Sequence, residues 1–175
     1  MKILDATAGS RGIWYQKDLP FVTFMDKREG KFVFYPNPKT KRTIDIKPDV
    51  VADWTKHVSS PDNYFDMVVF DPPHLVVSKK PKSEFKMHIQ YGYLLKDTWK
   101  QTLKKGFNEL FRVLKPEGFL VLKWCETDIK IMDVIKLSPY KPMFSNMSLK
   151  HNASSKDNYM VIFIKHNPDM ELDIN

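Results

Sequence analysis

The sequence has a single cysteine, Cys125, among its 175 residues. One cysteine excludes an internal disulfide framework and a zinc site built from several thiolates. A reducing compartment is the simplest setting for such a chain, so we expect a cytoplasmic protein. The five histidines are scattered without the spacing of metal ligands, and we therefore predict no metal site.

Long hydrophobic runs are also missing. No apolar run approaches the roughly 20 residues that cross a bilayer. Residues 1–4 lead at once to the charged Asp5, which is unlike the start of a signal peptide. We therefore expect no membrane association. The length fits one domain, and we predict that residues 1–175 form it.

Acidic residues are outnumbered by basic ones. The chain has 21 Asp and Glu against 28 Lys and Arg, which gives a formal net charge of +7. This excess favours a polyanionic partner, and nucleic acid is the obvious candidate. Many small soluble proteins are nevertheless basic without such a partner.

Apolar runs alternate with turn-rich segments along the chain. The expected strands are residues 2–5, 21–25, 50–52, 67–70, 119–124 and 160–164. Apolar residues at three- and four-residue spacing predict a helix over 97–114, and a turn at 115–118 then leads into the next strand. Parallel strands joined by crossovers predict an open α/β sheet. Residues 31–35 and 42–46 predict a protruding hairpin in place of one crossover helix.

Acidic residues close four of these strands: Asp5, Asp26, Asp53 and Asp71. In an open α/β sheet the binding crevice lies beyond the carboxyl ends of the strands, so we expect these side chains to converge. The loop after the first strand contains Gly9 but no G-x-G-x-x-G and no Gly-Lys-Ser/Thr, which excludes a dinucleotide fingerprint and a P-loop. An ordinary tight turn also explains this loop.

Two of these acids suggest that the crevice binds a nucleoside. Asp26 follows the glycine loop by about 20 residues, the position from which a carboxylate binds ribose hydroxyls. Asp53 and Trp54 form a pair that can hydrogen-bond and cover an adenine ring. Each acid alone is an ordinary strand-end residue, but together they predict a pocket for an adenosine moiety.

The segment Val-Val-Phe-Asp-Pro-Pro-His, residues 68–74, places a carboxylate between an apolar run and two prolines. Neither Pro72 nor Pro73 offers a backbone N–H, so neither can continue a sheet ladder, and both fix φ. The segment therefore holds the Asp71 carboxylate and one or two carbonyl acceptors at a strand end. The simpler alternative is that Asp71 caps the next segment while the prolines only end the strand.

Five segments together resemble the ordered motifs of class I S-adenosylmethionine-dependent methyltransferases: residues 4–12, 24–26, 51–53, 62–74 and 111–118. The resemblance covers almost the whole chain and is closest to the small, prophage-type members with an Asp-Pro-Pro-His-Leu segment. The Asp-Pro-Pro-His run is also similar to the D-P-P-Y/F/W motif of amino-methyltransferases that act on adenine. His74 stands where those enzymes have an aromatic residue, and we expect no separate recognition domain.

The resemblance implies a Rossmann-like fold with a seven-stranded, mostly parallel sheet, an antiparallel last strand and helices on both faces. It implies S-adenosylmethionine as cofactor. The residues expected to bind it are Asp5, Ala6, Thr7, Gly9, Ser10, Asp26, Lys27, Asp53, Trp54 and Asp71. The expected catalytic residues are Asp71, Pro72, Pro73 and His74.

The chemistry expected at this site is methylation of an exocyclic amino group of a nucleic-acid base, with adenine in DNA or RNA as the main candidate. The Asp71 carboxylate and the Pro72 carbonyl would accept the two amino hydrogens and hold the nitrogen in line with the methyl donor. His74 would either stack on the base and orient it or act as a general base.

The stretch at residues 78–93 is basic and contains interleaved aromatic residues. Its lysines suit phosphate contacts and its aromatic rings suit stacking on a base, although a solvated lid explains the composition equally well. Two other functions remain open for the whole chain. One is methylation of a protein or a small molecule, and the other is a silent cofactor-binding subunit that works with a partner or as a homodimer.

Overall fold

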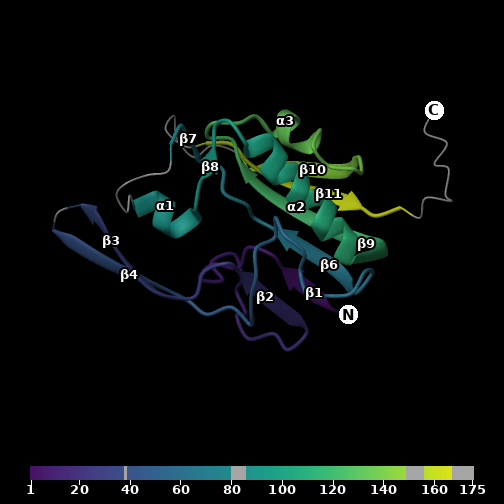
Figure 1. Ribbon diagram of the computed structural model, residues 1–175, viewed down its shortest axis with the longest axis horizontal. Helices are drawn as coiled ribbons and strands as arrows, with labels where there is room; N and C mark the ends of the chain where they lie inside the picture. The colour runs from purple at the N-terminus through teal and green to yellow at the C-terminus, as the bar shows by residue number, and fades with distance from the viewer. Residues whose placement is uncertain (38, 80–85, 149–155, 167–175) are drawn as a thin grey trace.

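The computed structural model describes residues 1–37, 39–79, 86–148 and 156–166 (Figure 1). Its strands and helices arise where the sequence carries continuous or periodic apolar residues. The strands of the central sheet are β1 (Ile3–Asp5), β2 (Val22–Asp26), β5 (Val50–Val51), β6 (Phe65–Phe70), β9 (Leu114–Cys125), β10 (Pro142–Ser148) and β11 (Asn158–Ile164).

The central sheet has seven strands in the order β10-β11-β9-β6-β1-β2-β5. Neighbouring strands from β5 to β9 pair in parallel, whereas β11 pairs antiparallel with both β9 and β10. The predicted fold class, a mostly parallel seven-stranded sheet whose last strand is antiparallel, is therefore confirmed. The parallel order places the carboxyl ends of β1, β2, β5 and β6 at one edge of the sheet.

Two differences from the expected strands have simple physical reasons. The predicted turn at residues 115–118 lies inside β9, where Glu117 adopts a φ of 63° and the pairing with β6 shifts register. The irregularity is a bulge-like kink that leaves the strand continuous. Strand β10 was not predicted, because its sequence, Pro-Met-Phe-Ser-Asn-Met-Ser, contains no β-branched residue. The segment forms a strand through its pairing with β11.

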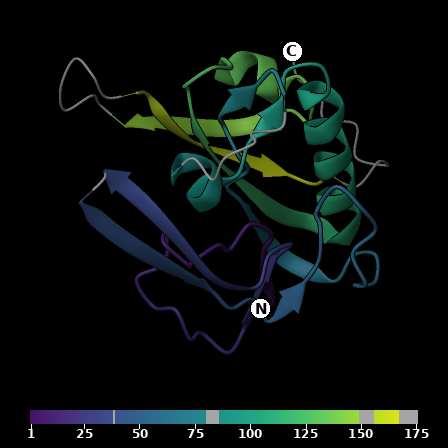
Figure 2. The same cartoon turned by 60° about the vertical axis from the view of Figure 1, so that its left-hand side comes forward.

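The remaining elements lie outside the central sheet. They are the antiparallel ribbon of β3 (Gly30–Asn37) and β4 (Thr40–Ile46), the short parallel pair of β7 (Val76–Val77) and β8 (Leu94–Leu95), and the helices α1 (Lys86–Tyr91), α2 (Trp99–Val113) and α3 (Ile131–Ile135). The ribbon confirms the predicted hairpin and extends away from the sheet beside α1 (Figures 1 and 2).

Helix α2 confirms the predicted apolar stripe and provides most of the core on one face of the sheet. Its residues Leu103, Phe107 and Leu110 are fully buried, and they pack with buried residues of β6 and β9 and with α3. The other face of β1, β2 and β6 has a smaller cluster, which Trp14 and Leu19 from the β1–β2 connection cover. That connection contains no helix.

Gly106 provides the close contact between α2 and the segment after β5. A Cβ atom at this position would lie 2.4 Å from Cε3 of Trp54. Gly106→Ala is expected to lower the free energy of unfolding by about 1–2 kcal/mol, because overpacking outweighs the better helix propensity of alanine. Urea denaturation measures this change. Gly12→Ala is the matched control, since nothing lies within 4 Å of its Cβ position. Equal stability of the two variants would contradict the prediction.

Candidate active site

A cleft with a volume of about 690 Å³ opens at the carboxyl ends of β1, β2 and β6. Most of the predicted site residues line it: Ala6, Thr7, Gly9, Ser10, Asp26, Lys27, Trp54, Asp71, Pro72, Pro73 and His74. Asp5 and Asp53 are not among the lining residues. The cleft has the size of pockets that hold small organic ligands, and it combines apolar walls with a few charged groups.

The loop after β1 forms one wall of the cleft and is fixed by backbone hydrogen bonds on both sides. The Ala6 N–H donates to the carbonyl of Val69 and the Ala8 N–H donates to that of Met25, each at 2.9 Å. Gly9 has a φ of 50°, a left-handed conformation that glycine adopts without strain. These contacts hold the loop across the ends of the three neighbouring strands.

The Asp26 carboxylate lies at the end of β2 and is already engaged. It accepts hydrogen bonds from the Gly9 N–H at 2.9 Å and from the backbone N–H, Nε and Nη2 of Arg28 at 2.9–3.1 Å. Arg28 also donates from Nη1 to the carbonyl of Ile89 in α1 at 2.6 Å. A ribose at Asp26 therefore has to compete with Arg28, a residue that lines the cleft and that the sequence reasoning missed. The sequence feature that could have identified Arg28 is its position two residues after Asp26, the acid at the end of β2.

Asp5 lies beneath the cleft and is almost completely buried. Its carboxylate accepts hydrogen bonds from the Trp14 Nε1–H at 2.7 Å and the Thr7 N–H at 3.0 Å. Burial raises the pKa of Asp5 to about 6, and the negative charges of Asp71 and Asp26 add to the increase. The hydrogen bonds from Trp14 and Thr7 act in the opposite direction and lower the pKa. Asp5 thus supports the loop from below.

The raised pKa of Asp5 makes its contribution to stability depend on pH. The folded protein holds a proton on Asp5 at a pH where the unfolded chain has lost it, so this contribution is full below about pH 4 and is lost as the pH rises through about 6. Asp5→Asn removes the titration. The unfolding free energy of the wild type relative to this variant is expected to fall by up to about 3 kcal/mol from pH 4 to pH 7. Urea unfolding at several pH values measures it, and a constant difference would contradict the assignment.

Asp53 and Trp54 are adjacent in sequence, but their side chains have different surroundings. The Asp53 carboxylate accepts the Thr55 N–H at 2.9 Å and the Thr55 hydroxyl at 2.8 Å, as in a turn. Trp54 is buried and its ring meets Phe70 edge to face at a centroid distance of 5.1 Å, so its indole forms part of the wall of the cleft. Only the tryptophan of this pair lines the cleft.

The Asp71 carboxylate is held in place at the end of β6. The Asp71 N–H donates to the Thr7 hydroxyl at 2.7 Å, and the Lys123 ammonium donates to Oδ2 at 2.9 Å. Both partners of this ion pair are partly exposed in the cleft. Lys123 comes from β9 and was also missed, since nothing in the local sequence indicates that it pairs with Asp71.

His74 follows the two prolines and faces aromatic neighbours. Its ring centroid lies 6.0 Å from that of Tyr91 in α1 and 6.5 Å from that of Trp124 in β9. Burial lowers the pKa of His74 below its ordinary value, with Asp71 opposing the change and Lys123 adding to it. The imidazole is therefore neutral near pH 7, a state that suits both stacking and proton acceptance.

Part of the basic stretch at residues 78–93 lines the cleft. Residues 80–85, which include Lys80, Lys82 and Phe85, lie outside the described residues. Tyr91 and Tyr93 line the cleft, as does Gly92, which has a φ of 74°. A Cβ on Gly92 would lie 2.9 Å from Cγ of Pro73, so this glycine lets the chain approach the proline pair closely.

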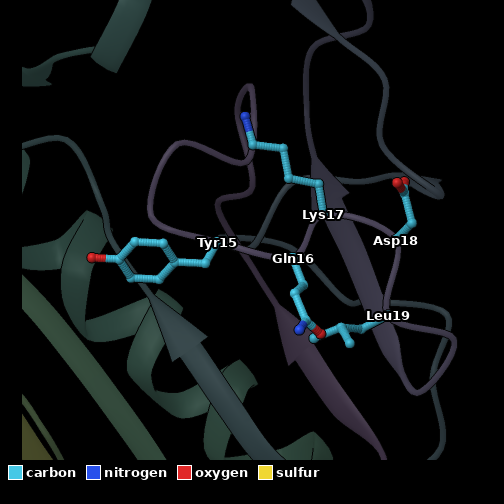
Figure 3. Close-up of a pocket in the computed structure, with 5 residues that line it drawn as sticks. All are labelled: Tyr15, Gln16, Lys17, Asp18 and Leu19. Carbon is cyan, nitrogen blue, oxygen red and sulfur yellow. The ribbon is translucent and has the colours of Figure 1, made fainter.

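A second hollow, of about 520 Å³, lies in the connection between β1 and β2 (Figure 3). It is lined by residues 15–19 and contains none of the predicted site residues. Tyr15 points away from the other lining side chains and is fully exposed. The five lining residues are consecutive in the chain and do not form a catalytic or binding arrangement that we recognise.

Two further features concern the described part of the chain. There, no group of three or more His, Cys, Asp or Glu residues gathers in a way that would hold a metal ion. No helix of the described residues is long and apolar enough to cross a membrane.

The chain resembles known proteins in its structure rather than in its sequence. No family model matches the sequence, and no curated protein matches it either. Solved structures do match. A methyltransferase dependent on S-adenosylmethionine from Methanosarcina mazei has a TM-score of 0.53 and 13% identity, with 94% of this chain and 92% of that chain covered. The fold is that of the S-adenosylmethionine-dependent methyltransferases.

Two further matches have defined activities. The N-methyltransferase NodS from Bradyrhizobium japonicum WM9 has a TM-score of 0.52 and 12% identity, with 94% of this chain and 84% of that chain covered. A 1,6-didemethyltoxoflavin-N1-methyltransferase from Burkholderia thailandensis, solved with S-adenosylhomocysteine, also has a TM-score of 0.52 and 12% identity, with coverages of 94% and 71%. Both are only 12% identical to this chain, so the match concerns the fold.

Proposed function

We propose that this protein is an S-adenosylmethionine-dependent methyltransferase that modifies an exocyclic amino group of a nucleic-acid base, with adenine as the main candidate. The observation that carries the proposal is the Asp71 carboxylate at the end of β6, which lies in the cleft. The Lys123 ammonium donates to this carboxylate, and the Asp71 backbone N–H donates to the Thr7 hydroxyl. The methyltransferase fold and the net charge of +7 support it.

The residues of the cleft suit the cofactor. Backbone from Ala6 to Gly9 approaches the ligand space closely, Asp26 offers acceptors for ribose hydroxyls once Arg28 releases it, and the Trp54 indole provides an apolar wall. When bound, S-adenosylmethionine supplies an already activated methyl group. The protein therefore has to position the acceptor nitrogen and leave the cleft poor in water.

The residues after β6 suit an amino group. The Pro72 carbonyl and the Asp71 carboxylate are two acceptors for its two hydrogens. Lys123 contacts Oδ2 of Asp71, and Oδ1 accepts no hydrogen bond from the described residues. Acceptors fixed before the reaction stabilise the positive charge that develops on the nitrogen. His74 and Tyr91 lie beside this point and offer rings against which a planar base can stack.

Calorimetry and a transfer assay test the function in sequence. Binding of S-adenosylmethionine to the whole chain is measured first, and absence of binding would overturn the enzyme proposal. Transfer of a labelled methyl group is then measured on DNA, RNA and protein. We expect label on nucleic acid, and nucleoside mass spectrometry identifies the base. Label only on protein would overturn the nucleic-acid assignment.

A further inference from the structure

The β3–β4 ribbon has one covered face and one open face. Side chains alternate along each strand, so Phe34 and Ile46 point to the same side, and both are buried. Strand β3 contacts α1, the helix that contributes His88 and Tyr91 to the cleft. Val33 and Tyr35 alternate with the buried positions, and 36% and 61% of their surfaces are exposed. The outer face therefore has no cover within the described residues.

Unpaired positive charge gathers on this ribbon. Lys31 and Lys41 lie on the open side with Tyr35, whereas Arg42 is paired with Phe34 and lies on the other side of the ribbon. All three are exposed and have no ion pair among the described residues. Asp45 is the acidic residue of β3 and β4, and Lys47 pairs with it at 3.0 Å. The ribbon thus presents cations together with one exposed aromatic ring, Tyr35, which is the composition of surfaces that follow a nucleic-acid backbone.

The ribbon is also joined to the cleft. It starts four residues after Asp26, and the intervening Lys27 and Arg28 both line the cleft. The Arg28 guanidinium links the Asp26 carboxylate to the Ile89 carbonyl of α1, so the base of the ribbon, α1 and the cleft are held together. Eight extended residues reach about 26 Å, which is on the order of eight phosphates along one strand of nucleic acid.

We propose that the β3–β4 ribbon binds the sugar–phosphate backbone of the nucleic acid next to the base that enters the cleft. Lys31, Lys41 and Arg42 contact phosphates, and Tyr35 packs on an unstacked base or a sugar. This inference rests on the proposed function and names the element that holds its substrate. It also supplies a protein surface that can hold nucleic acid during base extrusion.

Salt-dependent binding of labelled oligonucleotides tests the ribbon. The probes are a mixed-sequence single-stranded DNA, its duplex and the RNA of the same sequence, each long enough to cover both ribbon and cleft. The triple variant Lys31→Gln, Lys41→Gln, Arg42→Gln is expected to bind at least about tenfold more weakly than the wild type. The slope of log K against log salt should fall by about two to three, because each lost phosphate contact contributes about 0.7–0.9.

The matched control removes three lysines from the exposed side of α2: Lys100→Gln, Lys104→Gln, Lys105→Gln. Affinity of both variants for S-adenosylmethionine should equal that of the wild type, which shows that the fold and the cofactor site are intact. If the wild type binds or methylates nucleic acid and both triple variants lose the same affinity, the ribbon proposal fails while the proposed function stands. If the wild type neither binds nor methylates any probe, both fail.

Discussion

Asp71→Asn is expected to lower the rate of methyl transfer by at least about 100-fold while S-adenosylmethionine affinity changes little. The substitution keeps the size of the side chain and the backbone hydrogen bond to Thr7, but it removes the negative charge and one of the two carboxylate acceptors. Loss of one positioned group that acts on developing charge typically costs about 10²–10³ in kcat. Single-turnover transfer of labelled methyl groups measures the rate, and calorimetry measures cofactor binding.

The control for this substitution is Asp18→Asn. Asp18 is 98% exposed, lies outside the cleft and approaches Arg11 only at 3.7 Å, so its loss should leave transfer unchanged. Unchanged transfer in Asp71→Asn would show that the carboxylate is not catalytic. Loss of cofactor binding in the same variant would instead assign Asp71 to the cofactor site.

Phe107→Ala is expected to reduce the free energy of unfolding by about 3–5 kcal/mol. Phe107 is fully buried in α2, and its ring lies 5.6 Å from that of Phe70 and 5.9 Å from that of Phe163. The truncated side chain would leave a cavity between α2 and the centre of the sheet. The expected loss is a large fraction of the total stability of a domain, so the transition should move markedly in a urea titration.

Phe144→Ala provides the comparison within the sheet. Phe144 belongs to β10 and 62% of its surface is exposed, so little apolar contact is lost on truncation. We expect a change below about 1 kcal/mol, as for ordinary surface substitutions. Similar losses in both variants would show that the core is not centred on α2.

Much of the fold was predictable because local patterns agreed with the final packing. The run at residues 67–70 is continuous and apolar, and β6 is buried in the middle of the sheet. The stripe on α2 and the hairpin at β3 and β4 followed from spacing and turn residues. Strand β10 was missed because pairing with β11, rather than its own composition, makes it a strand.

The candidate site was predicted less completely, for a different reason. The acids at the strand ends were visible in sequence, but their hydrogen bonds were not. Asp5 turned out to be a buried support for the loop, and Asp53 bonds locally to Thr55. The partners Arg28 and Lys123 depend on how β2, α1 and β9 meet, and Lys123 is 52 residues from the Asp71 that it contacts.

The sequence by itself determined the parallel sheet, the edge at which a ligand site lies and the Asp-Pro-Pro-His segment, because backbone sterics and apolar periodicity act over a few residues. Only the tertiary structure decided which carboxylate faces the cleft, which is buried with a raised pKa, and which cation holds each of them. Those properties come from desolvation and Coulomb interactions between groups far apart in the chain, and their strength depends on distances that folding alone fixes.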